Sequence, residues 1–192
     1  ALAPVAAVGP PPDTPVFRTR AYSDDFAQAA ELVAAAVEGF HAGGVACTLK
    51  HFPGHGDTAS DSHYGAAYVT KSLEELRKEE LLPFLAGIEA GADMVMIGHL
   101  TVPALDEAPA PFSHAVVTEL LREELGFTGV VVTDALEMGA LGDYTSGESA
   151  VLAVQAGVDL LLCPGDPAEA PRALREGVKE GGLRRGRGGA SG

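Results

Sequence analysis

Short apolar segments alternate with longer amphipathic ones along this chain. Apolar residues recur at helical spacing between Phe26 and Phe40, Gly43-Gly44 ends that segment, and the apolar run 45–49 follows. Ser23 and Ser72 are the expected caps of two helices. The pattern predicts strands at 2–8, 45–49, 93–99, 129–133 and 158–163, and helices at about 26–40, 73–90, 113–125, up to 156, and 171–178. Because the strands are apolar almost throughout, we predict an α/β protein with a parallel sheet covered by helices.

Polar residues lie at the carboxyl ends of three of these strands. They are Lys50 with His51, then His99, and then Asp134. Ligands bind at this edge in (β/α) barrels and in doubly wound sheets. No G-x-G-x-x-G or P-loop sequence follows a strand, which disfavours a nucleotide-binding Rossmann domain. Five strands cannot close an eight-stranded barrel, so a barrel would need three further strands before Ala1.

Composition and charge restrict the classes of partner. The 192 residues fit one domain, and a net charge of −14 argues against binding to nucleic acid or to an anionic membrane. No apolar run has the length of a membrane span. We divide the chain into a domain of residues 1–180 and a Gly/Arg-rich tail, 181–192, which we expect to be disordered. The chain has neither an initiating Met nor a basic leader, so we expect a fragment.

The two cysteines, Cys47 and Cys163, lie in apolar runs without C-x-x-C spacing. We therefore expect two buried free thiols rather than a disulfide or a zinc site. Such a use of cysteine is compatible with a cytoplasmic protein.

The segment that begins at Lys50 concentrates titratable side chains. Residues 50–63 include one Lys, three His and two Asp, interrupted by Pro53, Gly54 and Gly56. The Pro and Gly residues predict a loop, and titratable loops at strand ends are typical of α/β active sites. A polar surface loop is the alternative without function. A zinc site is disfavoured. The H-x-x-x-H spacing brings two ligands together only on a helix, and the Pro and Gly residues of this segment disfavour a helix.

Two long segments resemble the signatures of the family 3 glycoside hydrolases, in their N-acetyl-β-glucosaminidase branch. The first is Lys50-His51-Phe52-Pro53-Gly54-His55-Gly56-Asp57-Thr58 with Asp61-Ser62-His63, and the second is the Val-Val-Thr-Asp-Ala-Leu-Glu-Met-Gly-Ala of residues 131–140. The resemblance covers about residues 3–164 and implies a (β/α)8 TIM-barrel type of fold, of which about the last five βα units are present. Ala7, where the family usually has Asp, and the closing residues 181–192 depart from the family.

The resemblance implies a role for each of these polar residues. Asp134 would be the nucleophile of a retaining glycosidase, and His63, oriented by Asp61, would be its general acid and base. Imidazole suits this task because its ordinary pKa is near the working pH. Arg20, Lys50 and His51 would bind the sugar, His55 and Asp57 would support the loop, and His99 would line the pocket. Without the motifs, Asp134 would be interpreted as a cap of the strand end or of the following helix, and Lys50 as a lysine at the rim of the barrel. His51 would then support the site residues without contacting the substrate.

The implied activity is exo-hydrolysis of terminal β-linked N-acetylglucosamine, with peptidoglycan (muropeptide) fragments from bacterial cell-wall recycling as substrates. The resemblance implies a carbohydrate partner, no cofactor, no catalytic metal, no nucleic-acid or membrane partner, and a cytoplasmic enzyme that is monomeric at full length. Two alternatives stay open: a β-N-acetylglucosaminide phosphorylase, and an inactive carbohydrate-binding fragment. The Asp61-Ser62-His63 sequence disfavours a β-glucosidase of the same family.

Overall fold

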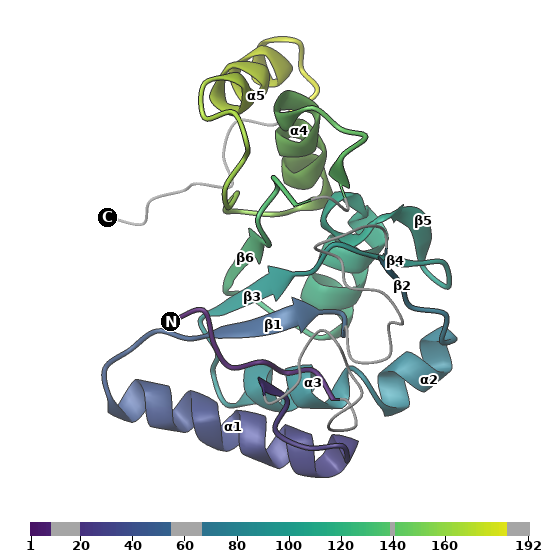
Figure 1. Cartoon of the computed structure of the whole chain (residues 1–192). Coiled ribbons are helices and arrows are strands. Elements are labelled where there is room, and N and C mark those ends of the chain that lie inside the picture. Colours follow the sequence, from purple (N-terminus) through teal and green to yellow (C-terminus); the bar gives the residue numbers. More distant parts are fainter. Residues whose placement is uncertain (9–19, 55–66, 139–140, 184–192) are drawn as a thin grey trace.

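The structure is a computed structural model that describes residues 1–8, 20–54, 67–138 and 141–183. A parallel sheet with the strand order β1-β3-β6 lies at its centre (Figure 1). β1 spans Thr48–Phe52, β3 spans Met94–Ile97 and β6 spans Val130–Thr133. Parallel bridges from Val5 to Lys50 and from Val132 to Leu160 extend the sheet on both sides. The strands therefore follow one another across the sheet in chain order.

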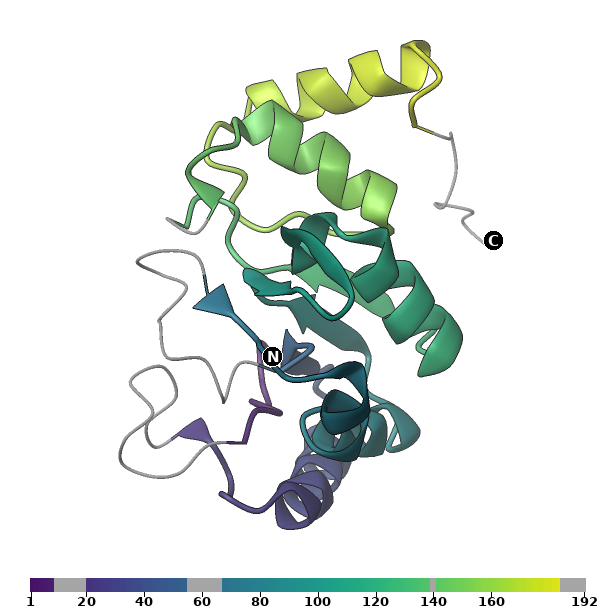
Figure 2. The ribbon, with the colours of Figure 1, turned by 90° about the vertical axis from the view of Figure 1, so that its right-hand side faces the viewer.

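Helices connect the strands, and four of them pack in two pairs. α1 packs along α3 beside β1, whereas α4 packs along α5 beyond β6 (Figures 1 and 2). The helices are α1 (Phe26–Ala42), α2 (Leu73–Lys78), α3 (Leu82–Glu89), the short 3-10 helix η2 (Ala110–Phe112), the π-helix η3 (Ala115–Glu124), α4 (Ser146–Ala156) and α5 (Glu169–Lys179).

Side-chain caps determine where three of the helices begin. The capping box predicted at Ser72 is confirmed, with Glu75 as its second member, and Thr145 caps α4 in the same way. The cap of α1 is Asp25 rather than Ser23. The Ser23 hydroxyl instead accepts the backbone N–H of Asp25, 3.0 Å away, so both residues shape the entry into the helix.

A second, smaller sheet was not predicted. It contains β2 (Ala67–Tyr68), which pairs in parallel with β4 (Leu100–Val102), and β5 (Asp106–Pro109), which pairs antiparallel with β4. β4 follows β3 almost directly, so this sheet lies beyond the carboxyl end of the central one. It places the segment that follows residue 66 next to the connection between β3 and η3.

Several sequence expectations were wrong in detail. The strands expected at 2–8 and at 158–163 are each reduced to an isolated bridge, at Val5 and at Leu160. The strand expected at 45–49 is displaced toward the carboxyl end, because the main chain of Lys50 pairs with the first segment: its carbonyl accepts the N–H of Ala6 at 2.7 Å. The helix expected at 73–90 is two helices, since Pro83 lacks an N–H and therefore suits the first turn of a helix, here that of α3. Cys163 is exposed rather than buried, although its carbonyl accepts the N–H of Glu137 at 3.1 Å beyond the end of β6.

The α/β architecture with parallel strands agrees with the prediction from the strand pattern. The described strands form an open sheet, and closure into a barrel stays a prediction. Leu183, inside the expected tail, is buried and donates its N–H to the carbonyl of Gly177 at 3.0 Å. None of the helices in the described part of the chain is both long enough and apolar enough to cross a membrane.

Helix α3 approaches β1 and α1 closely at Gly87. A Cβ atom at this position would lie 2.6 Å from Leu49 Cδ2 and 3.1 Å from Val33 Cγ1. Both neighbours are fully buried, so they have little room to move away. Gly87 thus determines how near the helix lies to the sheet that carries the polar residues.

We expect Gly87→Ala to lower the free energy of unfolding by about 1–3 kcal/mol, because the added methyl overfills the core. Gly39→Ala is the matched control, since Gly39 also lies in a helix but a Cβ there would meet nothing within 4 Å. This control should raise the free energy by about 0.5–1 kcal/mol through its better helix propensity. Urea denaturation measures both, and equal effects would contradict the close packing at Gly87.

Candidate active site

The register of the sheet brings the polar strand ends to one level. Ile97 lies beside Phe52 on one side and beside Thr133 on the other. The ladder continues one residue further, because the N–H of Asp134 donates to the carbonyl of Ile97 at 3.0 Å. The carboxyl ends of β1, β3 and β6 therefore form one edge, as expected of a parallel α/β sheet.

His51 and Asp134 meet across this edge. His51 Nε2 lies 3.4 Å from Asp134 Oδ2, and their side chains are only 10% and 17% exposed. They come from β1 and from the end of β6, which are separated by β3 and hence by about 10 Å of backbone. Their side chains must therefore reach across the middle strand.

Gly98, at the end of the middle strand, leaves the space that this contact needs. A Cβ at Gly98 would lie 2.9 Å from His51 Cβ, closer than such atoms normally approach. The missing side chain allows the imidazole to lie over the end of β3. In the sequence, this residue is recognisable as a glycine between a buried strand and a histidine. A glycine in such a position indicates that another group approaches the backbone closely.

Lys50 joins the same cluster although it is next to His51 in the strand. Regular alternation would turn the two side chains to opposite faces, but the register of β1 against β3 shifts between Lys50 and Phe52. Burial lowers the pKa of Lys50, the Asp134 carboxylate opposes this by raising it, and the Arg20 guanidinium lowers it further. Lys50, Asp134 and Arg20 are thus close enough to interact electrostatically.

The Asp134 carboxylate is oriented by the backbone that follows it. Its Oδ1 accepts the N–H of Ala135 at 2.8 Å, while Oδ2 faces His51. The carbonyl of the same Ala135 accepts an N–H from His99 Nε2 at 2.7 Å. His99 is 2% exposed, so the structure places it under the turn that carries Asp134 rather than on an open pocket wall. Ala135, as the residue held between them, was not identified from the sequence.

Part of the predicted site lies outside the described residues. His55, Asp57, Asp61 and His63 all belong to the segment 55–66, so the acid/base pair and the two loop-supporting residues stay predictions. The structure describes the other five predicted residues: Arg20, Lys50, His51, His99 and Asp134. It brings Lys50, His51 and Asp134 together, sets Arg20 within electrostatic reach of Lys50, and puts His99 behind Asp134.

Glu80, which the sequence analysis missed, connects the two flanks of that segment. Its side chain is 1% exposed, and its carboxylate forms an ion pair with Lys71 Nζ at 3.1 Å. A Cβ at Gly54 would lie 2.8 Å from Glu80 Cβ, so Glu80 also packs directly on the residue before the segment. The only signal in the sequence is a carboxylate beside the apolar run Leu81-Leu82-Pro83.

The chain matches the glycosyl hydrolase family 3 N-terminal domain over residues 1–187. It is 39% identical over 177 residues to beta-hexosaminidase A of Pseudoalteromonas piscicida, covering 85% of this chain and 30% of that protein. It is 44% identical over 144 residues to beta-hexosaminidase of Stenotrophomonas maltophilia, covering 74% and 43%. The chain therefore spans less than half the length of the curated relatives that it matches.

Solved structures are similar to this chain in fold and, in part, in sequence. A family 3 beta-N-acetylglucosaminidase from Paenibacillus superposes with a TM-score of 0.92 at 43% identity, covering 96% of this chain and 36% of that chain. The beta-glucoside phosphorylase BglX superposes with a TM-score of 0.91 at 26% identity, again covering 96% and 36%.

The effects of Asp134 and Arg20 on the pKa of Lys50 can be measured directly. Asp134→Asn should lower the pKa of Lys50 further, because it removes the negative charge that favours the ammonium form. Arg20→Gln should raise it, because it removes a positive neighbour. NMR titration of the lysine side-chain signals measures both shifts.

Glu74→Gln is the control for this titration, since it removes only the exposed partner of Lys78. It should leave the pKa of Lys50 unchanged. Shifts of the same sign in Asp134→Asn and Arg20→Gln would contradict the arrangement described above.

Proposed function

This chain belongs to glycosyl hydrolase family 3, and from that premise we propose that it forms part of a retaining exo-glycosidase for terminal β-linked N-acetylglucosamine. The names of its relatives, beta-hexosaminidase and beta-N-acetylglucosaminidase, support this substrate. The structural observation that carries the proposal is the buried contact of 3.4 Å between His51 and Asp134 at the carboxyl edge of the sheet. We further propose that the substrates are peptidoglycan fragments and that the whole enzyme is a cytoplasmic monomer.

In the first step, a carboxylate oxygen of Asp134 attacks the anomeric carbon, and the bond from that carbon to the leaving oxygen breaks. The leaving oxygen takes a proton from the His63 imidazolium, which Asp61 orients. The result is a covalent glycosyl ester on Asp134 and a free aglycone. The rigid turn at Ala135 and the neighbouring His51 support this role, because they hold the carboxylate in one orientation.

In the second step, neutral His63 removes a proton from a water molecule, whose oxygen attacks the anomeric carbon and releases Asp134. Two inversions give overall retention. Lys50 and Arg20 would donate hydrogen bonds to sugar oxygens, and the partial burial of Lys50 suits such a contact. His51 would both face Asp134 and donate to a sugar hydroxyl, which joins the two roles considered from the sequence.

A glycoside phosphorylase is the second candidate, because the phosphorylase BglX has a very similar fold at 26% identity. Phosphate would then replace water as the acceptor of the glycosyl group. A neutral imidazole base does not repel this anion, and two cationic side chains, Lys50 and Arg20, interact at the strand ends. Addition of phosphate and detection of N-acetylglucosamine 1-phosphate distinguishes the two reactions.

The proposed activity predicts hydrolysis of an aryl N-acetyl-β-glucosaminide and little hydrolysis of the corresponding β-glucoside. Asp134→Asn should reduce turnover at least about a thousandfold, because the amide is not a nucleophile. Asp143→Asn is the matched control, as Asp143 is an exposed aspartate in the loop before α4. Full activity of the Asp134→Asn variant would disprove the assignment of the nucleophile.

The same assay can test whether this chain is long enough to form a complete site. A second protein should be extended before Ala1 with sequence from the Stenotrophomonas relative, because the chain spans only 43% of that relative and the proposed barrel needs three further strands. Turnover by the extended protein alone would mean that the upstream segment completes the site. Sugar binding by both proteins, with turnover by neither, would identify a carbohydrate-binding protein without catalysis.

His63→Ala should slow substrates with poor leaving groups far more than activated aryl glycosides, because only the former need a proton on the leaving oxygen. The ratio of kcat/KM values for the two substrate types measures this, with His114→Ala as an exposed histidine control. Equal losses for both types would argue against the acid role of His63.

A further inference from the structure

The opposite edge of the sheet carries a second cluster, formed by His41, Cys47 and Asp93. His41 lies in the last turn of α1, Cys47 directly precedes β1, and Asp93 directly precedes β3. The possible ligand atoms of these three residues lie within 4.8 Å of one another. This edge is the amino end of the strands, whereas His51 and Asp134 lie at the carboxyl end.

The local sequence explains how three distant residues meet. Gly43 and Gly44 end α1, and Gly44 has a φ of 68°, which reverses the chain into β1. This turn sets Cys47 beside the end of the helix that carries His41. The Asp93 carboxylate then fixes both, since Oδ2 accepts the N–H of Cys47 at 2.9 Å and lies 2.9 Å from His41 Nε2.

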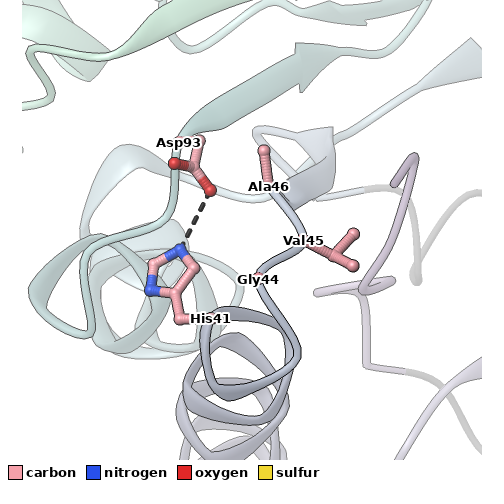
Figure 3. A pocket seen from close by; sticks show the side chains of 5 residues that line it. All are labelled: His41, Gly44, Val45, Ala46 and Asp93. Atoms are coloured by element: carbon pink, nitrogen blue, oxygen red, sulfur yellow. Dashed lines mark hydrogen bonds and ion pairs between the residues drawn. The ribbon is translucent and has the colours of Figure 1, made fainter.

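The cluster is accessible from one side and closed on the other. The Cys47 side chain is fully buried, whereas His41 and Asp93 are 38% and 42% exposed. A pocket borders them, lined by His41, Gly44, Val45, Ala46 and Asp93 (Figure 3). In Figure 3, the imidazole of His41 and the carboxylate of Asp93 face each other at this pocket. Of the three residues of the cluster, His41 and Asp93 line this pocket, and Cys47 is buried beside them.

We propose that His41, Cys47 and Asp93 form a binding site for a zinc-like divalent cation. Sulfur, imidazole nitrogen and carboxylate oxygen are together the donor set that zinc prefers, whereas magnesium and calcium prefer oxygen alone. Tetrahedral zinc separates its ligand atoms by about 3.3–3.8 Å, which small side-chain rotations can reach from the present spacing. Water from the pocket supplies the fourth ligand.

Occupation of this site joins the end of α1 to the starts of β1 and β3. Its effect is on stability, because a ligand that binds only the folded chain raises the free energy of unfolding. The thiol loses its proton when it binds the metal, so binding also releases a proton. The site is independent of the proposed glycosidase chemistry at the other edge of the sheet.

Cobalt(II) is the probe of choice, because a thiolate ligand gives it a ligand-to-metal charge-transfer absorption that oxygen and nitrogen ligands do not give. The chelator-treated chain is titrated with cobalt(II), and zinc(II) is then added in competition. We expect one cation per chain with the thiolate absorption, and a higher midpoint of thermal unfolding with zinc. Cys47→Ser should abolish the absorption, and His41→Ala should weaken zinc binding at least about tenfold.

Matched variants separate this site from other groups on the chain. Cys163→Ser removes the other cysteine, and His114→Ala removes an exposed histidine that lies 3.4 Å from Glu119, a similar pair without a thiol. Asp134→Asn perturbs the cluster at the carboxyl edge. All three should keep the absorption and the zinc affinity.

Binding without the thiolate absorption, or with an absorption that Cys163→Ser removes, would overturn the proposal. So would the absence of binding by a chain that is folded. If Cys47→Ser does not fold, unchanged zinc affinity in the exposed-site variant His41→Ala would overturn it equally.

Discussion

The parallel register of β1, β3 and β6 is the constraint on which the arrangement of polar groups depends. Hydrogen bonds at the strand ends carry the pairing one residue beyond the strands: Gly98 donates to Phe52, and Asp134 donates to Ile97, each at 3.0 Å. A slip of one residue would turn Asp134 to the other face of the sheet and remove it from His51. The close packing of α3 on β1 at Gly87 supports this register from behind.

The two edges of the sheet place similar groups in different environments. Asp134 and Asp93 each accept a backbone N–H, at 2.8 and 2.9 Å, and each faces an imidazole. Asp134 is 17% exposed, which favours chemistry that depends on strong electrostatic interactions away from water. Asp93 is 42% exposed and has a buried thiol beside it, which favours binding of an ion from solution.

The proposed catalytic groups divide between the rigid sheet and the segment 55–66. The nucleophile and its neighbours His51 and Lys50 lie on or next to strands, whereas the proposed acid and base lie in that segment. Glu80 connects the chain on the two sides of the segment, because it packs on Gly54 before it and forms an ion pair with Lys71 after it. The sheet thus supplies a fixed carboxylate, and the buried Glu80 connects the chain before and after the remaining groups.

The sequence by itself determined the α/β class, the capping box at Ser72 and the family, because these follow from local hydrophobic periodicity, local hydrogen bonds and contiguous motifs. It also placed Lys50, His51 and Asp134 at one edge. It did not determine that His51 contacts Asp134 while the neighbouring Lys50 also interacts electrostatically with that carboxylate, whereas regular alternation would turn the two side chains to opposite faces. Nor did it determine the space at Gly98, the buried Glu80, or the meeting of Cys47 with His41 and Asp93. These contacts join residues far apart in the chain, and only the packing of helices on paired strands brings such residues together.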